Sequence, residues 1–283
     1  MQTIAYRGHT LTWEEHSPGD HTFIFIHGYS GNRAIWGYEV AQFRDLGRCV
    51  TLDLPGHFPA QAPSQYKTLT QEELLDLEAH AIKAICGDGK ATLIGHSTGG
   101  MVALAVAARL PATVSRAISI GGVIWGPLTG LLHRMQWVVR FRLMMIYERP
   151  YIETQQSVEK LMQGIAHTYV YDSQSLLKNE VAWNVCRNWF PIYRQSSLHN
   201  FSVLLTTLET CNIRPLINGL ETPVLVLAGA HDPVVSPSQS RWVFTHLPNA
   251  DLHIFERTGH MVQWEEIERT HTVIRAWLQR YPV

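Results

Sequence analysis

The chain has 283 residues, of which 46% are hydrophobic and 17% are charged, and its formal net charge at pH 7 is −1. Globular proteins carry about 25% charged residues, whereas disordered chains are rich in charge and poor in apolar residues. The composition therefore excludes a mostly disordered chain. A net charge near zero creates no basic field around the protein, so we predict no nucleic-acid partner.

Two further absences bear on location and cofactors. The N-terminus has no charged segment followed by an apolar one, and no apolar run reaches the roughly 18 residues of a membrane-spanning helix. We therefore expect a cytoplasmic protein. The fifteen histidines include no H-E-x-x-H motif or other paired metal spacing, so we predict neither a metal ion nor another cofactor.

Short apolar runs alternate with helical patterns along most of the chain. Residues 3–13 alternate between apolar and polar side chains around a Gly-His break, which predicts a hairpin. Continuous apolar runs predict strands at residues 22–26, 49–52, 91–94, 116–120, 223–227 and 252–255. Helical spacing predicts helices after the capping box of Thr70 and Glu73, from Met101 and near Glu265. This order predicts an α/β fold with a mostly parallel eight-stranded sheet flanked by helices.

The alternation stops between residues 123 and 220. This segment is rich in Trp, Met, Leu and Tyr and has helical pieces but no comparable buried strand. We expect residues 1–122 and 221–283 to form one core, with residues 123–220 as a helical lid inserted after the sixth strand. Within this segment, residues 135–145 are basic and apolar. We favour a lid helix whose apolar face covers a pocket, with peripheral contact to an anionic membrane as the alternative.

The sequence Gly-His-Ser-Thr-Gly-Gly at residues 95–100 lies directly after one predicted strand and before a predicted helix. A G-x-S-x-G pattern in this context predicts a nucleophile elbow with Ser97 at its tip. The turn lifts the hydroxyl out of the sheet, the glycines leave room for the turn, and the helix N-terminus stabilises negative charge. The alternative is a loop rich in Gly and Ser with no catalytic role.

A serine nucleophile needs a base, and the base needs an acid that orients it. In this architecture the chain order is serine, acid, histidine. His260 follows the last predicted strand and Asp232 follows the strand before it, and no Asp or Glu lies between Asp88 and Glu148 to act as an earlier acid. We predict His260 as the base and Asp232 as its acid. The alternatives are a solvated loop histidine and an Asp that caps a turn.

The negative oxygen formed during attack on a carbonyl needs N–H donors. We predict one from Thr98, directly after the nucleophile, and one from Tyr29, in the loop after the strand 22–26.

The side chains expected near the substrate are mostly aromatic or small. An aromatic lid favours a hydrophobic substrate. For His96, a packing or hydrogen-bonding role is the favoured alternative to substrate contact. The candidates for substrate contact are His27, Gly28, His96, Trp125 and Trp137.

Several motifs match one known family. The matching residues are His27-Gly28-Tyr29, Trp36, Asp53–His57, Gly95–Gly100, Asp232 and Gly259-His260, which span nearly the whole core. On these residues the chain resembles α/β-hydrolase fold enzymes of the lidded serine esterase and non-metal haloperoxidase type. The resemblance implies that Ser97, Asp232 and His260 form a catalytic triad and that residues 123–220 are the lid.

The expected function is that of a serine hydrolase that cleaves carboxylic esters of a small to medium hydrophobic acyl substrate through an acyl-enzyme. C–C bond hydrolases, thioesterases, lactonases and acyltransferases use the same triad, so they remain alternatives. A non-catalytic ligand-binding protein of the same fold is less favoured, because all three triad residues are present.

Overall fold

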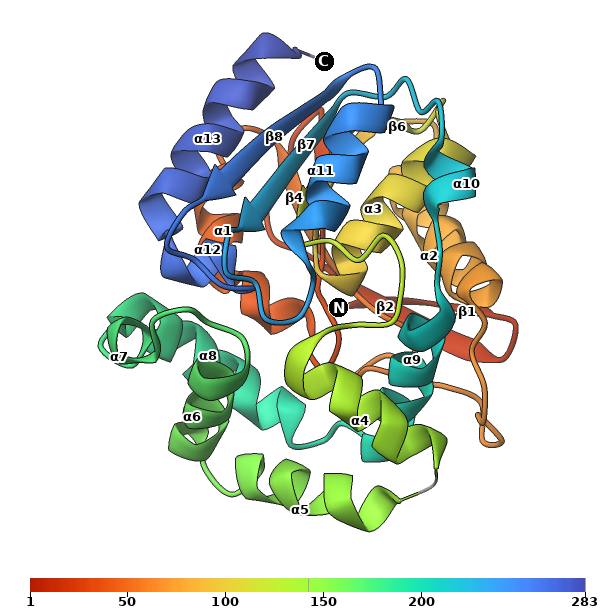
Figure 1. The fold of residues 1–283 in the computed structure, drawn as a ribbon. Coiled ribbons are helices and arrows are strands. Elements are labelled where there is room, and N and C mark those ends of the chain that lie inside the picture. The colour runs from red at the N-terminus through yellow and green to blue at the C-terminus, as the bar shows by residue number, and fades with distance from the viewer. Residues whose placement is uncertain (142, 283) are drawn as a thin grey trace.

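The computed structural model describes residues 1–141 and 143–282. Eight strands in this part of the chain form one sheet, in the order β1-β2-β4-β3-β5-β6-β7-β8 (Figure 1). The strands are β1 (Gln2–Tyr6), β2 (His9–Glu15), β3 (Thr22–Ile26), β4 (Arg48–Asp53), β5 (Ala91–His96), β6 (Val114–Ile120), β7 (Val224–Gly229) and β8 (Ala250–Phe255).

The sheet is mostly parallel, as the sequence predicts. β1 and β2 form an antiparallel hairpin, and β2 pairs antiparallel with β4. Every other neighbouring pair in the sheet is parallel. β3 is buried along its whole length: Ile24 and Ile26 pack into one hydrophobic cluster, and Phe23 and Phe25 into another. This burial on both faces explains why the strand has no polar alternation.

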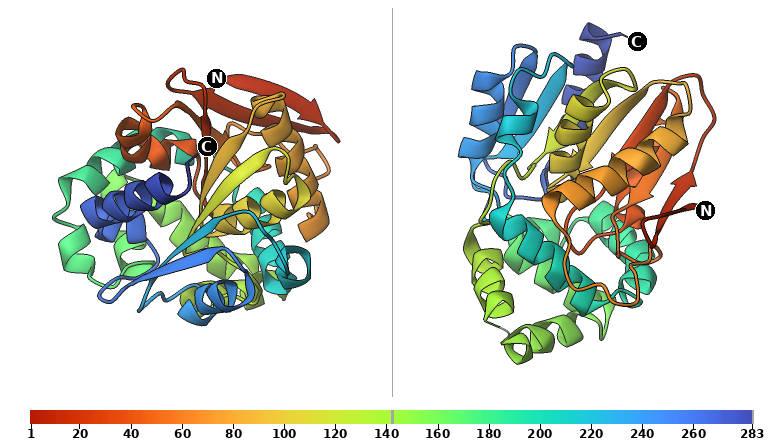
Figure 2. Two further views of the ribbon diagram at one scale, coloured as in Figure 1. Left: turned by 90° about the horizontal axis from the view of Figure 1, so that it is seen from above. Right: turned by 90° about the vertical axis from the view of Figure 1, so that its right-hand side faces the viewer.

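Helices cover both faces of the sheet (Figures 1 and 2). Side chains of α2, α3 and α11 belong to the same hydrophobic cluster as Ile24, whereas those of α1 and α13 belong to the cluster of Phe25. The bounds of these core helices are α1 (Gly37–Phe43), α2 (Gln71–Cys86), α3 (Thr98–Arg109), α11 (Pro237–His246), α12 (Val262–Glu265) and α13 (Ile267–Arg280).

Two predicted helix boundaries differ from the structure. α3 begins at Thr98 rather than Met101, because tight packing against β3 accommodates glycines that are poor helix formers in isolation. The predicted C-terminal helix near Glu265 is divided into α12 and α13, because Glu266 has non-helical backbone angles of φ −130° and ψ 54°.

Between β6 and β7 the described residues form helices, and α4 to α9 gather at the end of the sheet toward which β7 and β8 point, whereas α10 lies beside α3 (Figure 1; Figure 2, right). The division into a core and a lid remains a prediction. Arg142, part of the predicted basic and apolar segment, lies outside the described residues. These helices are α4 (Gly130–Arg140), α5 (Met144–Thr154), α6 (Val158–Thr168), α7 (Ser173–Leu176), α8 (Glu180–Tyr193), α9 (Leu198–Thr210) and α10 (Arg214–Ile217).

In the described part of the chain, no helix combines the length and the apolar character needed to cross a bilayer.

Candidate active site

Ser97 stands at the sharp turn between β5 and α3. Its backbone has φ 56° and ψ −115°, a conformation that L-residues rarely adopt, and its side chain is largely buried. Gly99 permits the turn, because a Cβ at this position would overlap the carbonyl group of Ile26 in the neighbouring strand. The local geometry is therefore that of the nucleophile elbow predicted from the sequence.

His260 and Asp232 are joined by a hydrogen bond of 2.7 Å between Nδ1 and Oδ2, and both side chains are 2% exposed. The other carboxylate oxygen of Asp232 accepts the backbone N–H groups of Val234 at 2.8 Å and Val235 at 2.9 Å. These bonds fix the carboxylate, which in turn fixes the imidazole. Because Nδ1 donates to Asp232, Nε2 is the ring nitrogen that can accept a proton.

The loop that carries His260 is held by groups that the sequence did not reveal. The backbone N–H of His260 donates to the carbonyl oxygen of Tyr169, at the end of α6, at 2.6 Å. The carboxylate of Glu265 accepts the N–H of Gly259 at 2.9 Å and that of Tyr171 at 2.8 Å. Burial raises the pKa of Glu265. A Glu near the start of a predicted helix is common, so no sequence signal marked this one.

Ser97 and His260 line a small cavity of about 40 Å³ together with Gly28, Tyr29 and His96. A Cβ at Gly28 would lie 2.8 Å from the Cβ of Ser97, so a glycine keeps the space beside the hydroxyl open. The structure therefore brings the predicted nucleophile and base to one cavity.

Of the two predicted oxyanion donors, Tyr29 lies on a loop and Thr98 directly follows Ser97. Thr98 is the first residue of α3, and the first N–H groups of a helix have no intrahelical acceptor. Tyr29 follows β3 and lines the same cavity as Ser97. Their roles remain predictions.

Two of the histidines expected at the substrate differ in position. His96 lines the cavity, and its Nε2 lies 3.0 Å from the carbonyl oxygen of His260. Burial lowers the pKa of His96 to about 3, so this ring is neutral beside the serine. His27 does not line the cavity as the described residues define it. Its side chain is fully buried, and its Nε2 accepts the backbone N–H of Leu54 at 3.0 Å. Its expected substrate contact is therefore wrong, because the ring braces the loop after β4.

The two tryptophans expected at the substrate lie elsewhere. Neither is among the described residues that line the cavity of Ser97 or the larger chamber beside it. Trp137 is 51% exposed, because it is two residues, or about 200° of helix rotation, beyond Met135 on the chamber side of α4. Its ring centroid lies 5.4 Å from that of Phe141, and the two rings are tilted. Trp125 packs edge-on against Trp242 of α11 and lies under the Arg214 guanidinium.

The described residues include no group of three or more His, Cys, Asp or Glu side chains that could hold a metal ion.

Comparisons with known proteins agree with this architecture. A family model described as alpha/beta hydrolase fold matches residues 21–267. A 2-hydroxy-6-oxononadienedioate/2-hydroxy-6-oxononatrienedioate hydrolase of Burkholderia vietnamiensis is 26% identical over 268 residues, covering 93% of this chain and 88% of the relative. A 2-hydroxy-6-oxo-6-phenylhexa-2,4-dienoate hydrolase of Burkholderia cepacia is 26% identical and covers 87% of this chain and 83% of the relative. Among solved structures, a thermophilic esterase from Thermogutta terrifontis superposes with a TM-score of 0.76 at 20% identity and covers all of both chains.

Proposed function

Because the chain belongs to the alpha/beta hydrolase fold family and is a hydrolase of that fold, we propose that Ser97, His260 and Asp232 are its catalytic triad. One observation carries this proposal: the 2.7 Å bond between His260 and Asp232 lies at a cavity that Ser97 also lines. A serine and a histidine oriented by a carboxylate are the parts that acyl transfer requires.

In the proposed reaction, Ser97 Oγ attacks a carbonyl carbon of the substrate while its proton passes to His260 Nε2. Asp232 stabilises the resulting imidazolium, and the N–H groups of Thr98 and Tyr29 donate to the negative oxygen. The bond to the leaving group then breaks, and the leaving group takes the proton from His260. Water attacks the acyl-enzyme with His260 as base, which releases an acid and restores Ser97.

The bond that breaks at the carbonyl carbon, to carbon or to oxygen, distinguishes a C–C bond hydrolase from an esterase. We place C–C bond cleavage first, because the two curated relatives described above are named hydrolases of 2-hydroxy-6-oxo compounds. Neither printed name contains an ester, so hydrolysis at the 6-oxo carbon breaks a bond to carbon. In this chain, that carbon would be protonated as the bond breaks, by the proton that His260 received from Ser97.

Ester hydrolysis is the second candidate, and the charge of the cavity favours it. The described residues that line the cavity of Ser97 include no Lys or Arg. A dienoate carries a carboxylate that would need a cation or several donors in a buried site, whereas a neutral ester does not. The same steps serve an alkoxide leaving group.

Two substrates, each assayed with the parent and with Ser97→Ala, test the function. We expect the parent to convert 2-hydroxy-6-oxo-6-phenylhexa-2,4-dienoate to benzoate and a five-carbon dienoate, measured by chromatography, and Ser97→Ala to be at least about 10³-fold slower. Release of p-nitrophenol from p-nitrophenyl hexanoate without cleavage of the dienoate would assign the ester function instead. A Ser97→Ala variant as fast as the parent on both would refute the triad.

A further inference from the structure

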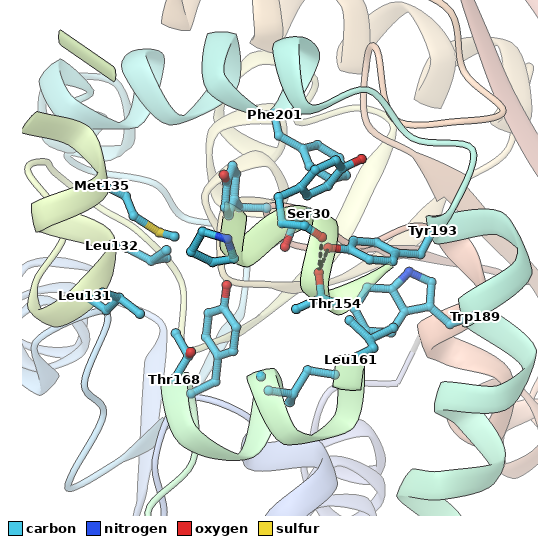
Figure 3. Close-up of a pocket in the computed structure, with 16 residues that line it drawn as sticks. Ser30, Leu131, Leu132, Met135, Thr154, Leu161, Thr168, Trp189, Tyr193 and Phe201 are labelled. Atoms are coloured by element: carbon cyan, nitrogen blue, oxygen red, sulfur yellow. Dashed lines mark hydrogen bonds between the residues drawn. The ribbon is translucent and has the colours of Figure 1, made fainter. Parts of the chain in front are cut away.

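A larger chamber, with a cavity volume of about 150 Å³, lies beside the cavity of Ser97. We call it the distal chamber. Its wall comes from α4, α5, α6, α8, α9 and the loop after β3 (Figure 3). Ser30, Leu132 and Tyr169 line both spaces, so one substrate can reach from the nucleophile into the chamber. A cavity of this volume holds a benzene-sized group.

The distal chamber has no positive charge among the described residues of its wall, since none of them is Lys, Arg or His. Leu131, Leu132 and Met135 of α4 form one side, and Leu161 of α6 contributes another apolar surface (Figure 3). Moving a carboxylate from water into such surroundings is strongly unfavourable unless a cation or several donors replace the lost water.

Two hydroxyl groups in the wall already donate their protons to backbone carbonyl oxygens. Tyr151 donates to the carbonyl oxygen of Ser196 at 2.6 Å, and Thr154 donates to that of Tyr151 at 2.8 Å. The hydroxyl of Thr154 also forms a 2.8 Å hydrogen bond with the hydroxyl of Tyr193 (Figure 3). The oxygens of Tyr151 and Thr154 therefore present lone pairs, which repel a carboxylate and tolerate an uncharged group.

Neutral donors also line the chamber: the hydroxyl groups of Tyr29, Ser30, Thr168 and Tyr169, and the indole of Trp189 where the two spaces meet. The indole N–H of Trp189 is buried and has no hydrogen-bond partner among the described residues, and its side chain lines both the chamber and the cavity of Ser97. Such neutral donors suit a carbonyl or ether oxygen, and none of them brings the positive charge that offsets the burial of a carboxylate.

We propose that the distal chamber selects an uncharged apolar or aromatic end of the substrate and rejects a carboxylate there. The inference rests on the proposed function, which places the reacting carbonyl at Ser97. It names the substrate class as one with a ring or alkyl end rather than a chain that ends in a carboxylate.

Matched ligands that differ only at the end of the chain test this. We expect heptan-2-one to bind at least about tenfold more tightly than 6-oxoheptanoate in calorimetry. We also expect kcat/KM for p-nitrophenyl hexanoate to exceed that for the mono-p-nitrophenyl ester of adipic acid by at least about tenfold. Equal or reversed preference in the binding measurement overturns the proposal.

A charge introduced into the wall should change the preference. Met135→Lys keeps an unbranched side chain, one atom longer, and adds an ammonium group, so the preference for the neutral ligand should fall at least about tenfold. Met135→Gln adds polarity without charge and should keep the parent order of binding. If Met135→Lys does not fold, the parent measurements still decide the proposal. A neutral preference in binding, together with p-nitrophenol release that persists in Ser97→Ala, would contradict the proposed function and leave the chamber assignment standing.

Discussion

Replacing Asp232 by Asn alters one hydrogen bond in a way that the structure makes predictable. In the parent, one oxygen of Asp232 accepts the N–H groups of Val234 and Val235, and the other accepts Nδ1–H of His260. In Asp232→Asn, the amide oxygen has to remain on the two backbone donors, because an NH2 group cannot accept them. The NH2 group therefore faces His260 and donates to Nδ1, which leaves the ring proton on Nε2.

A histidine with its proton on Nε2 cannot accept the proton of Ser97. We therefore expect kcat for p-nitrophenyl hexanoate at pH 7 to fall by about 10⁴-fold, equivalent to about 5.4 kcal/mol of activation free energy. Because shape and backbone bonds are kept, the unfolding temperature should change little. Asp232→Ala is the matched control: it leaves the N–H groups of Val234 and Val235 unpaired, so this variant should be both inactive and less stable. A folded Asp232→Asn variant within tenfold of the parent kcat would refute the reasoning.

Three further predictions concern stability and the edges of the site. Burial raises the pKa of Glu39 to about 8; the folded protein then holds a proton that the unfolded chain loses near pH 4.5, so the free energy of unfolding should fall by a few kcal/mol between pH 5 and 8. Urea titrations should show a smaller pH dependence in Glu39→Gln, and an unchanged slope would contradict that pKa. Glu265→Ala should lower kcat and the unfolding temperature, because it leaves the backbone N–H groups of Gly259 and Tyr171 without an acceptor. Glu265→Gln keeps one accepting oxygen, so its kcat and unfolding temperature should lie close to those of the parent. Equal losses in the two variants would argue against a role of Glu265 in holding the loop of His260. Trp137→Ala should keep kcat/KM for small esters within about twofold of the parent value, since this side chain is exposed and lines neither cavity. A tenfold loss of kcat/KM would show that Trp137 contacts the substrate.

The sequence by itself determined the sheet and the positions of the proposed triad. Continuous apolar runs such as that of β3 mark strands buried on both faces, and this pattern is local to a few residues. The elbow at Ser97 is also local, because strand, turn and helix follow one another directly. Chain order then restricted the partners to Asp232 and His260, whose loops follow neighbouring parallel strands and therefore meet at one edge.

The tertiary structure alone decided which aromatic residues line the two cavities and which groups hold the loop of His260. Composition predicted an aromatic pocket, but the rotation of α4 directs Met135 inward and leaves Trp137 outside. Glu265 meets Tyr171 across 94 residues of chain, through a contact that no local pattern encodes. The hydrogen bond from Tyr151 to Ser196 at the distal chamber likewise joins residues that are 45 positions apart in the chain. Periodicity reports which residues are buried, whereas the partner of each side chain depends on how separate elements pack.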